Sequence, residues 1–148
     1  MYTESVTTFI FGTIQNNVTT NNGGGLYVAT NANATILGAT FSGNQGGAAA
    51  GGLYIAAGAT VECENATFSE NKGLNGSTYA NSGAVYCAGT FTDTNSSYIG
   101  NEAKNGVAFF VPAGGSVTLT GTVATKAIIK DNIAVTADGG AIFVNNTT

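Results

Sequence analysis

The stretch Gly51-Gly52-Leu53-Tyr54-Ile55 decides the fold, because it is one copy of a motif that returns along the chain. The motif is a small residue and a glycine followed by alternating apolar and aromatic residues. Its other copies occupy residues 24–28, 82–87, 105–110 and 139–144. Strand-like units that recur every 20–50 residues or so are typical of solenoids and propellers.

A second motif, apolar-x-x-Asn, alternates strictly with the first. Its apolar members are Val18, Phe41, Phe68, Tyr98 and Ile129, and its asparagines are Asn21, Asn44, Asn71, Asn101 and Asn132. Asparagine tolerates a left-handed backbone, and stacked amides can hydrogen-bond along a row. We therefore predict that the asparagines form a ladder at a turn. The variable inserts all follow this asparagine, as expected for loops that leave a β-helix sideways.

Threonine-rich apolar stretches, such as residues 34–40 and 115–122, lie between the two motifs. Each coil thus offers about three short strands separated by glycine and asparagine turns, and no window has a helical period. We predict an all-β fold, a right-handed parallel β-helix (β-solenoid) of about five coils of 23–34 residues. Residues 1–148 form one domain without a recognisable cap at either end.

Side chains alternate in direction along a strand, so the motifs predict rows of stacked side chains. The glycine motif gives two inward rows, namely Leu26, Leu53, Val85, Ala108 and Ile142, and Val28, Ile55, Cys87, Phe110 and Val144. The apolar members of the second motif form a third inward row. The aromatic row of Tyr27, Tyr54, Tyr86, Phe109 and Phe143 then faces outward as a contact surface, or it belongs to the core if the phase is reversed.

The alternation of Gly-Gly-x-aromatic with Phe-x-x-Asn resembles the repeats of chlamydial polymorphic outer membrane proteins and related autotransporter-like adhesins. The matching residues are those at 51–54, 68–71, 41–44 and 139–142, and the resemblance runs from about Val18 to Val144. It implies a β-helix that works as a surface adhesin.

Composition excludes several functions. Charged residues make up only 8% of the chain, the net charge is −4, and the four positive charges are all lysines, so a nucleic-acid partner is not expected. Apolar runs are too short to span a membrane. Histidine is absent, which removes nucleophilic triads and zinc sites. The one carboxylate cluster that the pattern allows is Glu62, Glu64 and Asp93. We predict no enzyme activity, no catalytic residue, no metal and no cofactor.

Cys63 and Cys87 lie in adjacent coils, where they can form a disulfide or stay as two buried thiols. Seven Asn-x-Ser/Thr sequons begin at Asn17, Asn33, Asn65, Asn75, Asn95, Asn145 and Asn146, as in a glycosylated extracellular protein. The Thr-x-Thr runs at 90–94 and 118–122 do not recur at one place in every coil, so a continuous ice-binding plane is not expected.

Three functions remain. The first is an extracellular structural protein, a β-solenoid subunit or segment that stacks head to tail with its own copies into a surface filament or fibre. The second is the passenger segment of a cell-surface adhesin that binds glycans or proteins of a neighbouring cell. The third, a carbohydrate-active β-helix enzyme, lacks the residues for it. We favour the first, because an uncapped solenoid exposes unpaired strand edges at both ends.

Overall fold

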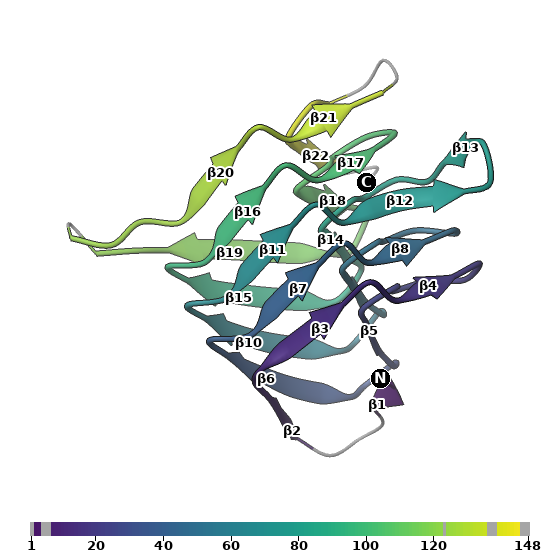
Figure 1. Cartoon of the computed structure of the whole chain (residues 1–148). Coiled ribbons are helices and arrows are strands. Elements are labelled where there is room, and N and C mark those ends of the chain that lie inside the picture. The colour runs from purple at the N-terminus through teal and green to yellow at the C-terminus, as the bar shows by residue number, and fades with distance from the viewer. Residues whose placement is uncertain (1, 4–6, 123, 136–138, 146–148) are drawn as a thin grey trace.

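The structure is a computed structural model that describes residues 2–3, 7–122, 124–135 and 139–145; of residues 2 and 3 it describes the backbone alone. These residues form strands and no helix. The strands stack in parallel through about five coils, so the predicted all-β β-solenoid is confirmed (Figure 1).

Four parallel sheets run along the solenoid. Sheet A contains β1 (Tyr2–Thr3), β5 (Leu26–Val28), β9 (Leu53–Ile55), β14 (Val85–Cys87), β18 (Phe109–Val111) and β22 (Ile142–Val144). Sheet B contains β2 (Thr8–Ile10), β6 (Asn33–Leu37), β10 (Thr60–Glu64), β15 (Thr90–Thr94) and β19 (Ser116–Thr120). Sheet C contains β3 (Thr13–Gln15), β7 (Thr40–Ser42), β11 (Thr67–Ser69), β16 (Ser97–Ile99) and β20 (Ile128–Lys130).

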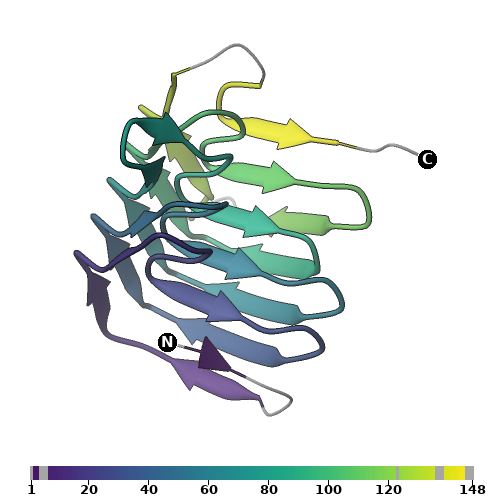
Figure 2. The same ribbon diagram turned by 90° about the vertical axis from the view of Figure 1, so that its right-hand side faces the viewer.

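Sheet D adds a fourth strand to each coil, where the sequence had predicted about three. It contains β4 (Val18–Thr19), β8 (Gln45–Gly46), β12 (Lys72–Asn75), β17 (Glu102–Ala103) and β21 (Ile133–Ala134), with β13 (Thr78–Tyr79) antiparallel to β12. Four of the five parallel strands are two residues long, too short to leave a periodic signal. The chain passes through sheets B, C, D and A in turn, and β1 and β22 lie at opposite ends of the stack (Figure 2).

The inward rows of sheet A lie where the sequence placed them in four of the five coils and differ in the fourth. Val85 pairs with Phe109, and Val111 pairs with Val144, so Phe109 and Val111 take the inward positions predicted for Ala108 and Phe110. Phe109 is fully buried. Because two aromatic residues are adjacent there, either one satisfied the motif, and only strand pairing separates them.

The apolar row of sheet C begins at Ile14 rather than Val18. Ile14 pairs with Phe41, whereas Val18 pairs with Gln45 in sheet D and is 72% exposed. The prediction for Val18 was therefore wrong. Both residues are followed three positions later by asparagine, but Ile14 follows a threonine, as Phe41 and Phe68 do. That threonine was the sequence signal for the correct register.

Left-handed residues turn the corner between sheets C and D. The asparagines at this corner are Asn17, Asn44, Asn71, Asn101 and Asn132, and the residue before each of them has a positive φ. These residues are Asn16 (56°), Gly43 (60°), Glu70 (55°), Gly100 (64°) and Asp131 (56°). The sequence had assigned the left-handed conformation to the asparagine that follows. Most residues with a Cβ are strained in this region by roughly 1–2 kcal/mol. Asparagine and aspartate adopt it at lower cost, and glycine, which has no Cβ, adopts it without strain.

Glu70→Gly should therefore stabilise the fold, because glycine removes the strain at φ 55°. The greater freedom of glycine in the unfolded chain offsets part of this gain, which leaves roughly 0.5–1 kcal/mol. Urea unfolding measures the difference. Glu70→Ala is the matched control, since it removes the same carboxylate but keeps a Cβ, and its stability should stay near wild type. Equal stabilisation by both variants would contradict backbone strain as the cause.

Candidate functional site: the two ends of the solenoid

A ladder of asparagine amides runs along the solenoid at the corner between sheets C and D. Asn71 shows the repeating contact. Its Oδ1 accepts from the backbone N–H of Asn44 (3.1 Å) and from Asn44 Nδ2 (3.0 Å). Its own Nδ2 donates to the carbonyl of Phe41 (2.9 Å) and to Asn101 Oδ1 (3.0 Å). The side chain is fully buried, so these four bonds satisfy an amide that water does not reach.

The ladder consists of Asn17, Asn44, Asn71, Asn101 and Asn132. Asn17 thus takes the place that the sequence had given to Asn21, and that prediction was wrong. The backbone N–H of the exposed Asn21 donates to Thr19 Oγ1 instead (3.1 Å). Asn17 follows Ile14 by three residues, just as Asn21 follows Val18. The choice of Val18 over Ile14 therefore caused both wrong predictions.

The two ends of the ladder are complementary. Each asparagine gives its backbone N–H and one Nδ2 hydrogen to the next Oδ1, in the direction of β21. Within the part of the chain that the structure describes, no donor reaches Asn17 Oδ1 and no acceptor receives the backbone N–H of Asn132. One end therefore offers the acceptor, and the other end offers the donors, of the contact that every coil inside the solenoid makes.

An outer row of sheet D shows a second match between the ends. By strand pairing the row runs through Val18, Gln45, Lys72, Glu102 and Ile133. Its middle is polar: Lys72 Nζ lies 2.9 Å from Glu102 Oε2, and hydrogen bonds from Tyr79 and Lys72 lower the pKa of Glu102. Its terminal members, Val18 and Ile133, are apolar although 72% and 59% exposed.

The core is open at the end formed by β19 and β22. A hollow of about 320 Å³ is lined there by inward residues of both strands, among them Val117, Leu119, Ile142 and Val144. The side chains of Ile142 and Val144 are 47% and 64% exposed, whereas their partners in the next coil, Phe109 and Val111, are buried. Among the described residues, no further coil covers the inward rows at this end.

The three carboxylates that the sequence grouped do not form a cluster. Glu62 and Glu64 lie on the outer face of β10 and are exposed. Asp93 lies in an inward row of sheet B, after Ile36 and Cys63. Its side chain points into the solenoid and has no exposed surface. Asp93 therefore lies on the opposite face of sheet B from the two glutamates. A pair of carboxylates for acid–base chemistry is not brought together at this place.

Asp93 instead belongs to a small buried polar group that the sequence analysis missed. Ser96 Oγ donates to Asp93 Oδ1 and accepts from the backbone N–H of Ala66 (2.9 Å). Cys63 Sγ lies 3.6 Å from the same Ser96 oxygen. Burial, followed by the nearby charge of Asp93, raises the pKa of the Tyr98 hydroxyl. The parity of Asp93 with Phe91 along β15 was the signal that it faces inward.

The two cysteines are free and buried, which corresponds to the second of the two alternatives that the sequence left open. They lie in different sheets, Cys63 in β10 and Cys87 in β14. Burial raises the pKa of both thiols, that of Cys87 to about 11, and the charge of Asp93 raises that of Cys63 further. Cys87 Sγ donates to the carbonyls of Gly89 and Ser116, both at 3.3 Å.

The sequons lie mostly on the surface. Asn33, Asn65, Asn75 and Asn145 are exposed, Asn95 is partly buried, and Asn146 lies outside the described residues. Asn17 is exposed, but its Nδ2 donates to Asn44 Oδ1 (2.9 Å), so its amide serves the ladder. Asn65 and Asn95 both have a positive φ, 53° and 64°, at the corner between sheets B and C. Turn geometry thus accounts for two of the sequons.

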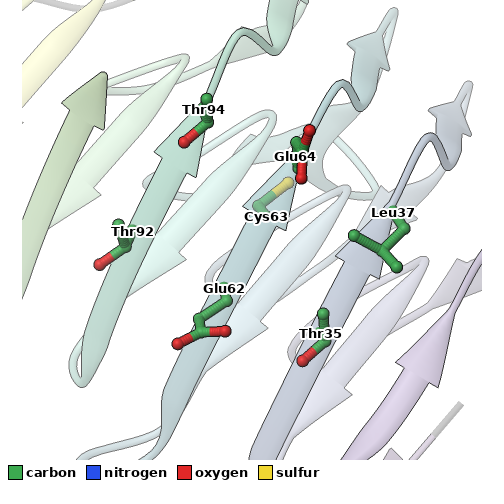
Figure 3. A pocket seen from close by; sticks show the side chains of 7 residues that line it. All are labelled: Thr35, Leu37, Glu62, Cys63, Glu64, Thr92 and Thr94. Carbon is green, nitrogen blue, oxygen red and sulfur yellow. The ribbon is translucent and has the colours of Figure 1, made fainter. Parts of the chain in front are cut away.

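The outer face of sheet B carries a polar patch in which hydroxyl rows adjoin over two coils. Thr92 pairs with Thr118, and Thr94 pairs with Thr120, with the two hydroxyls of the second pair 2.8 Å apart. Glu62 and Glu64 interrupt both rows toward β6. Figure 3 shows the shallow hollow of about 210 Å³ in this region, where Glu62 lies between Thr35 and Thr92. As predicted, the threonines do not form a plane over every coil.

The outer aromatic row is a continuous stack on sheet A. Successive rings of Tyr27, Tyr54, Tyr86, Phe110 and Phe143 lie 5.0, 4.9, 5.2 and 4.9 Å apart and are nearly parallel. Phe110 takes the place predicted for Phe109. Because each ring covers the face of the next, the stack presents ring edges along its length. Among the described residues, no ring covers the outer face of Phe143 at one end of the row.

Neither a metal-binding cluster nor a membrane-spanning helix is present among the described residues. No group of three or more cysteine, aspartate or glutamate side chains there could hold a metal ion. Among the same residues, no helix is long and apolar enough to cross a membrane.

Asn71→Ala should destabilise the fold strongly. It leaves the backbone N–H of Asn44 without its partner, at about 1–3 kcal/mol, and removes one hydrogen bond each from Asn44 Nδ2, the carbonyl of Phe41 and Asn101 Oδ1, at about 1 kcal/mol each. We expect a total loss of more than about 3 kcal/mol in urea unfolding. Asn75→Ala, at the exposed end of β12, is the matched control and should change stability by less than about 0.5 kcal/mol. Similar losses for both variants would contradict the structural role of the ladder.

The thiols should be inert in the folded protein. Since the raised pKa values keep both thiols protonated at pH 8, Ellman's reagent should react only after unfolding and then report two thiols per chain. The burial of neutral thiols stabilises the fold fully below their ordinary pKa of about 9, and this contribution is lost as the pH rises toward 11. A fast reaction of one thiol at pH 8 in the native protein would contradict this arrangement.

Comparison with known proteins gives no assignment. No protein-family model matches the chain, and neither the curated proteins nor the solved structures contain a significant match to it. The fold is therefore established by the strand pairing of this chain itself.

Proposed function

We propose that this chain is an extracellular structural protein, a β-solenoid unit that joins end to end with further units into a fibre or surface filament. The observation that carries the proposal is the complementarity of the asparagine ladder. Among the described residues, no donor reaches Asn17 Oδ1 at one end, whereas Asn132 offers such donors at the other. Both asparagines stand three residues after the isoleucine of their row. A buried amide ladder gains its last bonds when another coil follows.

The remaining strands support the same joint. When β3 of one unit follows β20 of another, β2 follows β19 and β4 follows β21 with the register that each sheet already has. Val18 then lies beside Ile133, so both exposed apolar side chains are covered. At about 4.8 Å per coil, a five-coil unit adds about 24 Å to the fibre.

The exterior of the cell is favoured by the exposed sequons and by a surface that is hydrated through Asn, Thr and Ser rather than through charge. The resemblance of the repeats to chlamydial surface proteins favours a second candidate, a segment of an adhesin passenger. In that case the same joint forms within one longer chain. The length of the natural gene distinguishes the two, since a long array of further repeats indicates an adhesin.

A charge exchange at the joint tests the proposal. The wild-type protein should form filaments in electron microscopy, with an axial repeat of about 24 Å. Val18→Glu with Ile133→Glu should abolish them, because two carboxylates then meet across the joint. Val18→Glu with Ile133→Lys should restore them, since this pair places lysine before glutamate along the row, as in the Lys72–Glu102 contact.

Gln45→Glu is the matched control, because it adds a carboxylate to the middle of this row, beside Lys72, and should leave assembly unchanged. Circular dichroism confirms that each variant is folded. A wild-type protein that stays monomeric at high concentration would contradict the proposal, and so would a charge-exchanged variant that does not recover.

A further inference from the structure

Sheet A contains one strand more than a continuous stack of units can hold. In the described parts of the chain, sheets B and C have five strands each, as does the parallel path of sheet D, and sheet A has six. Along the chain, β1 immediately precedes β2, and β22 immediately follows β21. When β2, β3 and β4 of one unit follow β19, β20 and β21 of another, β22 of the first unit and β1 of the second therefore fall at the same position, next to β5.

We propose that units join by strand exchange, in which β22 of one copy displaces β1 of the next copy and pairs with its β5. This inference rests on the end-to-end assembly proposed above and specifies its partner and contact. Addition of a strand from a second chain to an open sheet edge is a general mode of protein recognition, because backbone hydrogen bonds supply the affinity and alternate side chains supply the specificity.

β22 fits the position better than β1 does. It has three residues, Ile142–Val144, in the apolar-aromatic-apolar pattern of sheet A, whereas β1 places the polar Thr3 opposite the inward Val28. In the exchanged pair, Ile142 lies opposite Leu26, Phe143 opposite Tyr27 and Val144 opposite Val28. These are the pairings of like residues that β9 makes with β5 on its other side.

The exchange also joins the outer aromatic stacks of the two copies. Phe143 is stacked on Phe110 at 4.9 Å, and Tyr27 is stacked on Tyr54 at 5.0 Å. With β22 beside β5, the Phe143 ring continues onto Tyr27, so one uninterrupted row of rings passes through the joint. The exposed inward side chains of Ile142 and Val144 become buried at the same step.

β1 therefore acts as an internal competitor for its own binding edge. A copy whose β1 is in place has its sheet A closed at that end, and assembly requires β1 to leave. A variant that lacks residues 1–3 should assemble with a lag at least several-fold shorter than that of the full chain. Phe143→Asp, which places a carboxylate in the aromatic stack, should prevent assembly.

Cysteine cross-linking tests the exchange directly. One population carries Phe143→Cys and the other Tyr27→Cys, and the two are mixed under oxidising conditions. The exchanged joint places the two Cα atoms on directly paired residues of adjacent strands, close enough for a disulfide. Within one chain the two positions are separated by the intervening strands β9, β14 and β18, so a disulfide between them can only join two copies.

Phe143→Cys mixed with Tyr2→Cys is the matched control, because these positions meet only if β1 stays in place and β22 stacks on it. A covalent dimer from the first mixture and none from the second supports strand exchange. A dimer from the second mixture alone overturns the exchange but leaves end-to-end assembly intact. No dimer from either mixture, with monomers alone in light scattering of the unmodified protein, overturns both.

Discussion

A side-chain amide that is buried must find a partner for every donor and acceptor, and this requirement organises the solenoid. Asn44, Asn71 and Asn101 meet this requirement with two kinds of hydrogen bond. Each donates to the ladder asparagine of the next coil and to the carbonyl of the apolar sheet C residue in the preceding coil. These hydrogen bonds form only if every coil places its asparagine at the same corner, directly above the asparagine of the coil before it. The spacing between apolar residue and asparagine is therefore fixed at three residues, while the loops elsewhere vary in length.

The fixed corner aligns the other rows. Once Phe41 and Phe68 lie one above the other, with rings 4.7 Å apart, the strands on both sides follow in register. The Tyr27 stack outside sheet A and the Leu26 row inside it are then parallel consequences of one repeat. Each row gains dispersion and apolar burial from a neighbour of its own kind, which explains how so few charges suffice for this fold.

The repeat architecture could be predicted from the sequence, because its motifs are long and strictly alternating. The errors lie where two residues satisfied one motif equally: Val18 competed with Ile14, and Phe109 with Phe110. Pairing with the neighbouring strand decides such cases, and a motif scored by itself does not contain that information. The two-residue strands of sheet D lacked a period, and the left-handed position fell on Glu70, a residue that rarely adopts this conformation.

The direction of the amide ladder has a consequence for any fibre built from this chain. Every side-chain carbonyl in the row points toward the preceding coil, so the amide dipoles add along the axis, whereas the backbone groups of the sheets point alternately up and down and largely cancel. Such a fibre is polar, because one tip is electropositive and the other is electronegative. Monomers meet two chemically different surfaces, so the two tips grow at unequal rates, and fibres of opposite polarity cannot fuse tip to tip.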